Sequence, residues 1–489
     1  MLPTGTISPS PTITRESSSQ GSTRHTVIRH ALVNDGLLQE GEADAWRIAR
    51  HPFQITSAEI TFFEQLGHHL LAFYRTLNRL YLESVKGQQP AWIHQYFDQG
   101  KPESLLAYAR MNRFKNVVPH VIRPDIIPTD DGMIMTELDS VPGGMGLTGS
   151  LARTYGELGE HVVGEADGLP QGFAAMLLSR TKDTQPTIAI VVSDESESYR
   201  AEMQWLTLQL KNQGLAIACV PPQDLRFNDD GLYLPAQFGE RPVSLVYRFF
   251  ELFDLPNIPK FELLMYAAKK GLTTVTPPYK PWLEEKLAFA MIHHPMLEQY
   301  WKAHLSGETF QTLKRLMPHT WVLDPQPIPP MGVIPGLTLG DQPISDWRAL
   351  GTASQKERQY VIKPSGFSEL AWGSRGVSIG HDRSQTEWTQ TIEHGLDSFS
   401  TTPYILQEFY KGQLYSVEYY DEQTQDWTAM DGRARLSPYY CVIGDEAKLS
   451  GILATVCPKD KKIIHGMRDA VMVPCGTGLN KNRNVQNER

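Results

Sequence analysis

The sequence lacks the signatures by which metal-binding, secreted and membrane proteins are usually recognised. Its cysteines, Cys219, Cys441, Cys457 and Cys475, are too widely spaced for a zinc knuckle or a redox pair. No apolar run approaches about 18 residues, the length that spans a bilayer, and the N-terminus has no apolar signal-peptide core. We therefore expect a cytoplasmic protein without a membrane partner.

The sequence also lacks a basic stripe. The formal net charge is -9, and lysine and arginine are scattered along the chain, which argues against nucleic acid as a partner. One local cluster, KDKKIIHGMR at 459–468, favours a solvated surface, with a binding patch as the alternative.

A length of 489 residues predicts two to four domains. Residues 1–24 and 476–489 are poor in apolar side chains and are expected to be flexible tails. Residues 25–110 are expected to be helical. Thr56 and Glu59 form a possible capping box at the start of a long amphipathic helix that ends at Gly87, and a second helical run covers 103–114.

Strands and helices alternate over residues 186–280. A continuous apolar strand at 187–193, a helical face from Tyr199 to Leu210 and a strand at 215–220 together predict a βαβ unit. A further strand at 244–250 and a helix ending at Gly271 continue the pattern. This α/β domain has neither a Rossmann nor a P-loop glycine pattern.

Two later segments carry residues suited to a nucleotide. In YVIKPSGFSELAWGSRGVSIG, 360–380, two strands flank a glycine-rich flap whose N–H groups suit phosphate oxygens, while Lys363 adds a point charge. The segment 403–421 favours a β-hairpin that contains Gln407 and Glu408. Each pattern taken alone is also typical of a purely structural hairpin.

The order of these segments resembles the nucleotide-binding half of the ATP-grasp superfamily. The resemblance implies that Lys363 and the flap, with Gly373 and Gly376, bind phosphates, and that Gln407, Glu408 and Phe409 bind adenine and ribose. The usual downstream Glu-x-Asn metal pair is absent, because that region reads MDGRARLSPYY.

Carboxylates occur upstream instead, in RPDIIPTDDGMIMTELDSVPGG at 123–144. This stretch resembles the metal-binding region of glutathionylspermidine synthetase and other circularly permuted ATP-grasp ligases, with Asp139 where the family has Asn. The resemblance implies Mg²⁺ ligands at Asp125, Glu137 and Asp139, and a phosphoryl-stabilising role for Arg123. The TDDG turn predicts a hairpin that brings the carboxylates together, and strand periodicity places residues 137 and 139 on one face.

Weaker matches extend the expected site. Lys286 in a predicted helical segment resembles a family nucleotide lysine, although a surface lysine is an alternative. Arg435 resembles a family arginine near the transferred phosphate, with Arg433 as its rival, and Arg375 in the flap is expected to close over the γ-phosphate. N–H groups near Gly143 to Gly146 suit an anion such as a substrate carboxylate, and a plain loop that leads into a helix is the alternative. His465 and Asp469 are interpreted as structural.

The expected architecture is α/β, mixed with α+β, with a circularly permuted ATP-grasp core. Its metal-binding part covers 111–185, an inserted pre-ATP-grasp-like α/β domain covers 186–280, and the nucleotide-binding region covers 281–475. The resemblance implies an enzyme that uses ATP and Mg²⁺ to join a carboxylate to an amine through an acyl phosphate. The acid and amine would be an amino acid, peptide or polyamine. An ATP-grasp phosphotransferase and an inactive nucleotide-binding partner protein are the alternatives.

Overall fold

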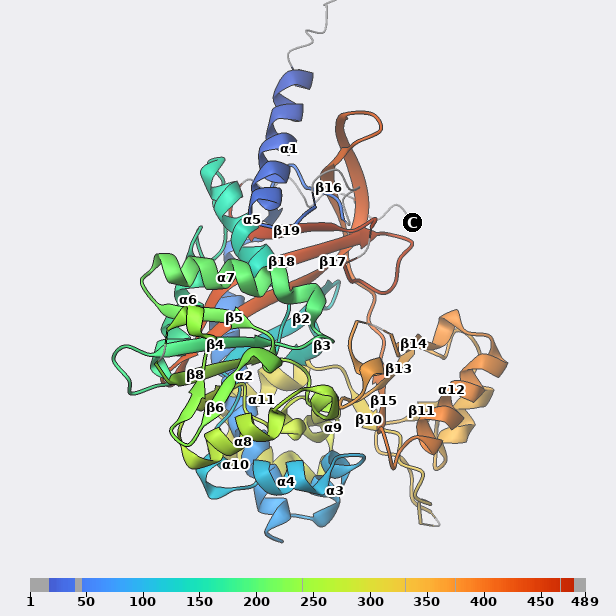
Figure 1. Cartoon of the computed structure of the whole chain (residues 1–489). Coiled ribbons are helices and arrows are strands. Elements are labelled where there is room, and N and C mark those ends of the chain that lie inside the picture. The colour runs from blue at the N-terminus through green and yellow to red at the C-terminus, as the bar shows by residue number, and fades with distance from the viewer. Residues whose placement is uncertain are drawn as a thin grey trace, which may run out of the picture.

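The structure is a computed structural model of the chain, and it describes residues 17–39, 46–239, 241–329, 331–373, 375–466 and 468–478. Figure 1 shows two packed layers and a smaller lobe at the right, which carries α12 (Gln385–Asp397). The mixed α/β fold class is confirmed. Among the described residues, no helix combines the length and the apolar character needed to cross a bilayer.

The other α-helices are α1 (Ser17–Asn34), α2 (Ser57–Val85), α3 (Ala91–Asp98), α4 (Glu103–Ala109), α5 (Met145–Glu157), α6 (Gly168–Ser179), α7 (Arg200–Asn212), α8 (Phe261–Lys270), α9 (Ala288–His293), α10 (Glu298–His304) and α11 (Gly307–Leu316). The strands are β1 (Phe53–Gln54), β2 (Val121–Thr129), β3 (Gly132–Asp139), β4 (Thr187–Val192), β5 (Ala216–Val220), β6 (Arg226–Asn228), β7 (Gly231–Tyr233), β8 (Val243–Phe249), β9 (Thr274–Thr276), β10 (Thr320–Val322), β11 (Thr338–Leu339), β12 (Gln342–Pro343), β13 (Tyr360–Pro364), β14 (Ser378–Ile379), β15 (Tyr404–Glu408), β16 (Leu414–Asp421), β17 (Asp426–Ile443), β18 (Glu446–Pro458) and β19 (Val471–Gly476).

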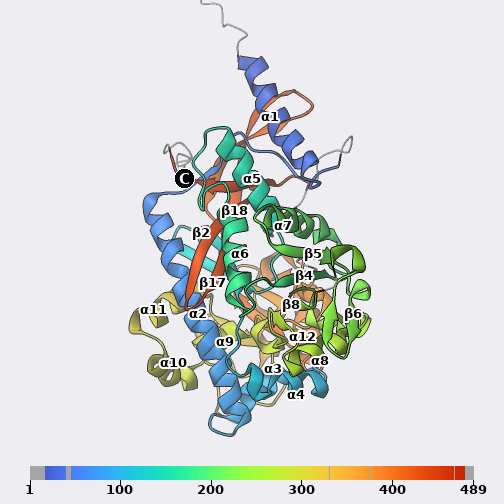
Figure 2. The same ribbon diagram turned by 60° about the vertical axis from the view of Figure 1, so that its left-hand side comes forward.

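The largest sheet has the order β1-β19-β18-β17-β2-β3, with β16 also paired to β17. Helices cover both of its faces. The hydroxyl of Tyr440 donates to the carbonyl oxygen of Phe63 in α2, whereas Gly172 of α6 lies close to Cys441. Because neighbouring residues of a strand point to opposite faces, α2 and α6 lie on opposite sides of β17. Figure 2 shows α6 running alongside β17 and β18.

The long helix α2 begins as the sequence predicts. Thr56 caps it in a complete capping box with Glu59, and the helix ends at Val85, just before Gly87 with its positive φ of 72°. Gly67 is required where α2 crosses the sheet, since a Cβ atom there would lie 2.5 Å from the carbonyl oxygen of Ala447. The predicted run 103–114 is helical only to Ala109, followed by a short 3-10 turn.

The predicted βαβ unit is confirmed. The parallel sheet β5-β4-β8-β9 places α7 as the crossover between β4 and β5, and every residue of β4 is buried. The helix α8 ends at Gly271, as expected.

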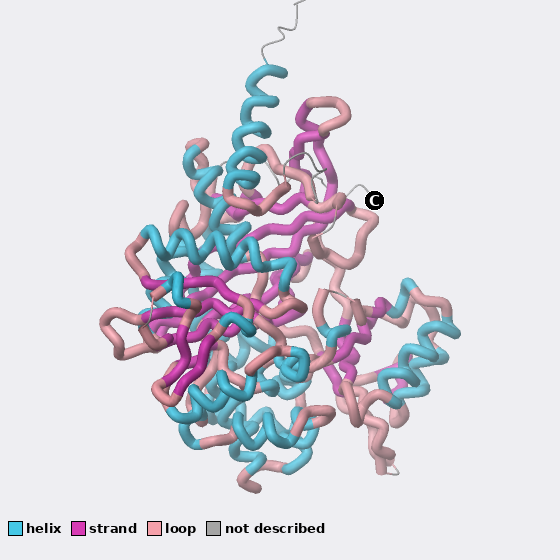
Figure 3. Tube along the Cα trace, viewed as in Figure 1, coloured by secondary structure: helices cyan, strands magenta, loops and turns pink. Residues whose placement is uncertain are grey.

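The smaller lobe contains the antiparallel sheet β10-β15-β13-β14. This sheet packs against α12 in one hydrophobic core, which includes Trp321 of β10, Leu406 of β15 and Trp388 of α12. In Figure 3 its strands stand apart from the largest sheet and from the parallel sheet. The predicted pairing of β13 with β14 around the flap is confirmed.

The hairpin predicted over 403–421 is wrong. β15 pairs on both edges, with β10 and β13, so it has no free edge for β16. β16 instead pairs with β17 over residues 414–421 and crosses into the largest sheet. Between the two strands, the N–H of Gln413 donates to the carbonyl oxygen of Pro128.

Two further expectations need correction. Residues 17–24 belong to α1 and not to a flexible tail, while residues 1–16 and 479–489 lie outside the described residues. Lys286 lies before α9 and not within a helix. The N–H of Lys286 donates to the carbonyl oxygen of Ser365, and the N–H of Leu287 donates to Ser365 Oγ. Ser365, which we call the flap base because it follows β13 at the start of the flap, thus accepts from N–H groups that would otherwise form helical hydrogen bonds.

Candidate active site

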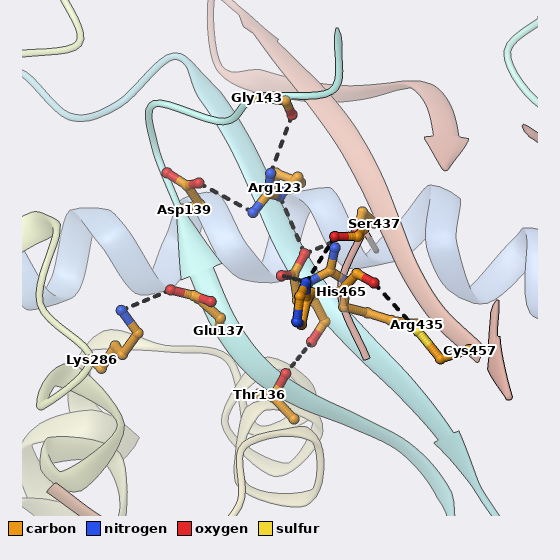
Figure 4. Close-up of polar contacts among 12 residues, drawn as sticks. Arg123, Thr136, Glu137, Asp139, Gly143, Lys286, Arg435, Ser437, Cys457 and His465 are labelled. Atoms are coloured by element: carbon orange, nitrogen blue, oxygen red, sulfur yellow. Dashed lines mark hydrogen bonds and ion pairs between the residues drawn. The ribbon is translucent and has the colours of Figure 1, made fainter. Parts of the chain in front are cut away.

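The hairpin of β2 and β3 forms in the predicted register. Asp125 lies opposite Glu137, and Arg123 lies opposite Asp139. Figure 4 shows Glu137 and Asp139 projecting to the same side of β3, with Lys286 reaching Glu137. The expectation that both carboxylates share one face is therefore confirmed.

Each of these carboxylates is paired with a cation. Lys286 Nζ lies 2.7 Å from Glu137 Oε1. Asp125 lies 3.2 Å from both Arg123 Nε and Arg435 Nη1, and it accepts a hydrogen bond from Ser437. Asp139 lies 3.2 Å from Arg123 Nη2. Arg123 thus bridges two of the three predicted ligands.

The predicted nucleotide lysine lies beside this hairpin. Lys363 Nζ donates to the carbonyl oxygen of Thr136 at 2.8 Å. We call the cavity that Lys363 enters the lysine cavity, and its polar walls include Asp125, Glu137, Lys286, Lys363, Gln407 and Arg435. The structure therefore brings β2 and β3 together with the smaller lobe, across more than 200 residues of sequence.

Burial and neighbouring charges shift the pKa values of Lys363 and Glu137. Burial lowers the pKa of Lys363 to about 8, although Glu137 acts in the opposite direction. Burial pushes the pKa of Glu137 up, but Lys286 and Lys363 outweigh it and hold this pKa at about 2. Glu137 is therefore ionised at neutral pH, whereas the proton on Lys363 is held only weakly.

The segment that was expected to bind adenine forms part of the wall of the lysine cavity. Gln407, Glu408 and Phe409 all line it. The side-chain amide of Gln407 donates to Thr320 Oγ1 at 3.0 Å, and Glu408 accepts from the hydroxyl of Tyr410 at 3.0 Å. These contacts fix both side chains against neighbouring segments of the lobe.

A second cavity adjoins the first. We call it the acidic cavity because Glu137, Asp139, Glu251 and Glu284 line it, together with Lys286 and Ser140. Glu137 and Lys286 belong to the walls of both cavities. This shared wall places two cavities of different character side by side.

The predicted metal trio is divided between the two cavities. Asp125 and Glu137 line the lysine cavity, but Asp139 lines the acidic cavity. In the part of the chain that the structure describes, no three His, Cys, Asp or Glu side chains are placed to hold a metal ion together. Mg²⁺ in nucleotide sites is commonly held by one or two carboxylates plus phosphates, so Asp125 and Glu137 fit that role. Asp139 shares Arg123 with Asp125, so its role as a third ligand stays a prediction.

No family model matches this sequence, and no curated protein matches it. Among solved structures, a glutathione synthetase like-effector from Globodera pallida in apoform superposes with a TM-score of 0.57 at 11% identity, covering 95% of this chain and 98% of that chain. The two chains share a fold. A candidate gamma-glutamylcysteine synthetase from Methylobacillus flagellatus KT gives a TM-score of 0.40 at 12% identity, over 87% of this chain and 89% of that chain.

The flap residues that were expected to contact phosphate lie in different positions relative to the two cavities. Arg375 lies outside both cavities: it is about half exposed, stacks on Trp372 at 4.3 Å and lies 3.6 Å from Glu195. Gly373 adopts a positive φ of 63°, and a Cβ atom on Gly376 would lie 2.7 Å from Pro364 Cδ. Both glycines thus shape the loop, while Leu370, Ala371 and Val377 form the cavity wall.

Arg435 and Arg433, the two candidates for an arginine near the transferred phosphate, lie in different surroundings. Arg435 lines the lysine cavity beside Asp125. Arg433 instead donates to the carbonyl oxygens of Gly412 and Lys459.

The anion site expected near Gly143 to Gly146 is filled by the protein itself. The N–H groups of Gly144 and Leu147 donate to the two carboxylate oxygens of Glu202, at 3.2 and 3.0 Å. An anionic ligand would have to displace Glu202, so the expectation of a substrate site there is wrong. His465 Nδ1 donates to the carbonyl oxygen of Gly466, and Asp469 pairs with Arg47 at the surface.

Sequence reasoning missed one wall of the lysine cavity. Lys462, Ile463 and Ile464, from the cluster interpreted as solvated surface, line it, and Lys462 forms an ion pair with Asp382. It also missed Glu251. The basic composition at 459–468 could have indicated the wall that contains Lys462. The sequence offers no signal for Glu251.

Proposed function

We propose that the chain is an ATP-dependent carboxylate–amine ligase that works through an acyl phosphate. The observation that carries the proposal is the shared wall of Glu137 and Lys286 between a cavity with lysines and a cavity with carboxylates. Phosphoryl transfer requires nucleotide and acceptor in adjacent, oriented positions. The glutathione synthetase-like fold is consistent with this chemistry but does not transfer it.

In the proposed reaction, a carboxylate oxygen of the acid attacks the γ-phosphorus of ATP, and ADP leaves with the electron pair of the broken P–O bond. The amine nitrogen then attacks the carbonyl carbon, a C–N bond forms, and phosphate leaves with the electron pair of the broken C–O bond. A protonated amine loses two protons in this step: one ends on the phosphate and the other in solvent.

The chain's own residues would mainly position and neutralise. Lys363 and Lys286 would hold phosphate oxygens as point charges, and Arg435 would face the phosphoryl group during transfer. Gln407, Glu408 and Phe409 would orient the base. When bound on Asp125 and Glu137, Mg²⁺ would neutralise phosphate charge. Arg123, between Asp125 and Asp139, would set the positions of both carboxylates.

The test is a phosphate-release screen of amino acids, dipeptides and polyamines with Mg-ATP, followed by hydroxylamine trapping with every acid that stimulates release. A ligase yields a hydroxamate of the acid, and the Lys363→Met variant yields none. ATP-dependent formation of a stable phosphoester without hydroxamate would instead establish the phosphotransferase alternative. Tight ATP binding without turnover across the screen would favour the inactive nucleotide-binding alternative.

A further inference from the structure

Four carboxyl groups line the acidic cavity, and three of them are paired with a cation. Glu137 pairs with Lys286, Asp139 pairs with Arg123, and Glu284 pairs with the buried Arg248. Glu251 has no ion pair or side-chain hydrogen bond with any residue that the structure describes. Arg248 and Lys286 act on Glu251 electrostatically, but neither forms an ion pair with it.

A second polar group in this cavity also lacks a partner. Ser140 is 1% exposed and lines the cavity, yet its hydroxyl forms no hydrogen bond within the described residues. A buried hydroxyl without a partner is costly, so a ligand that supplies a partner would gain free energy there. Ser140 therefore shares this cavity with Glu251 and Glu284.

The rest of the wall is apolar and aromatic. Phe253, Phe367 and Trp372 line the cavity. Aromatic faces attract an organic ammonium group, and apolar walls accept its carbon chain. A bare divalent cation would instead need several carboxylates converging on one point, and the described residues hold no such group of three.

We propose that the acidic cavity binds the amine substrate in its protonated form, with the ammonium group between Glu251, Glu284 and Ser140. The assignment as substrate rests on the proposed function, whereas the binding itself does not. A carboxylate next to the amine would be repelled by Glu251 and Glu284. The cavity is therefore selective for amines without a neighbouring carboxylate, and amino acids are excluded as the amine partner.

The perturbed carboxyl groups are consistent with a missing cation. Burial, reinforced by Glu284 and Asp139, raises the pKa of Glu251 to about 8. Burial also raises the pKa of Glu284 despite Arg248. The location suits the reaction, because Glu137 and Lys286 separate this cavity from the one that Lys363 enters.

The test measures binding calorimetrically on the full chain without ATP, with matched probes: butylamine, 4-aminobutanoate and butanol. We expect butylamine to bind at least about tenfold more tightly than the other two. Glu251→Gln is isosteric and breaks no contact within the described residues, so the protein should fold normally while butylamine affinity falls at least about tenfold. Ser140→Ala should weaken binding by a smaller factor, and Glu446→Gln, an exposed carboxylate elsewhere, should have no effect.

Equal affinity for butylamine and butanol, or an unchanged affinity in Glu251→Gln, would overturn the proposal. Strong Mg²⁺ binding that Glu251→Gln abolishes, with butylamine binding unaffected, would show a divalent-cation site instead and would overturn it too. The proposed function fails separately. Butylamine binding without any ATP turnover would support this cavity as a cation site and would contradict the proposed ligase function. ATP turnover that does not change in Glu251→Gln would contradict only the assignment of this cavity to the amine substrate.

Discussion

The ammonium group of Lys286 lies 2.7 Å from a carboxylate oxygen of Glu137, and this pair forms the boundary between the lysine cavity and the acidic cavity. Glu137 thereby neutralises one lysine of the proposed phosphate site and faces the proposed acceptor site. The pair is formed by residues 149 positions apart in sequence. Its position makes Glu137 the most informative residue for substitution.

Glu137→Gln is expected to abolish ATP turnover, with a loss of at least about a hundredfold in kcat, because it removes the carboxylate that pairs with Lys286 and would hold the metal. The side chain is 33% exposed, so the fold should remain intact. Phosphate release and thermal unfolding measure the two effects. Retained activity would count against the assignment, and Glu446→Gln serves as the control.

Lys363→Met should lower ATP affinity sharply, by about tenfold or more, since it removes a buried positive charge from the proposed phosphate site. A titration with a non-hydrolysable ATP analogue measures the change. An unchanged affinity would show that Lys363 and β13 do not contribute to the nucleotide site.

ATP binding should depend on pH through Lys363. Burial lowers the pKa of this lysine to about 8, and a phosphate partner favours its protonated form, so affinity should fall as the pH rises from about 7 to 9. The Lys363→Arg variant, which stays protonated, should show a flat profile over that range. A wild-type profile as flat as that of the arginine variant would contradict the prediction.

Lys101 and Glu285 should stabilise the flap base. Their charged groups lie 2.6 Å apart at 0% and 1% exposure, and Glu285 also accepts a hydrogen bond from Ser365. Lys101→Met leaves a buried carboxylate unpaired and should cost about 3–5 kcal/mol in the free energy of unfolding. The double variant Lys101→Met/Glu285→Gln should recover part of that loss in denaturant titrations. Simple additivity of the two single variants would show that the groups are not coupled.

Arg435 and Arg433 provide a matched pair. Arg435→Met should lower kcat strongly, because this guanidinium lies beside Asp125 in the lysine cavity. Arg433→Met should lower stability more than activity, because Arg433 binds main-chain carbonyl oxygens. Steady-state kinetics on both variants test the distinction, and equal losses of kcat would contradict it.

Local patterns predicted the parts of this site that local physics decides. The TDDG turn and the twelve-residue spacing were enough to place Asp125 opposite Glu137, and strand alternation placed Asp139 on the same face. The Lys363 strand and the glycine flap follow from the same kind of local reasoning.

What the sequence could not predict depends on long-range contacts. β15 and β16 look like a hairpin, but each has a better partner elsewhere. The N–H groups after Pro142 look like an anion site, but Glu202 occupies them from α7. Lys286 looks helical, but Ser365 takes its N–H. In each case a side chain or strand distant in sequence outcompetes the local preference.

The most direct test of the central claim is a crystal structure of the chain with Mg²⁺ and a non-hydrolysable ATP analogue. We predict that the phosphates contact Lys363 and Lys286, and that the base lies against Gln407, Glu408 and Phe409. A nucleotide bound elsewhere, with Lys363 still donating only to Thr136, would contradict the account.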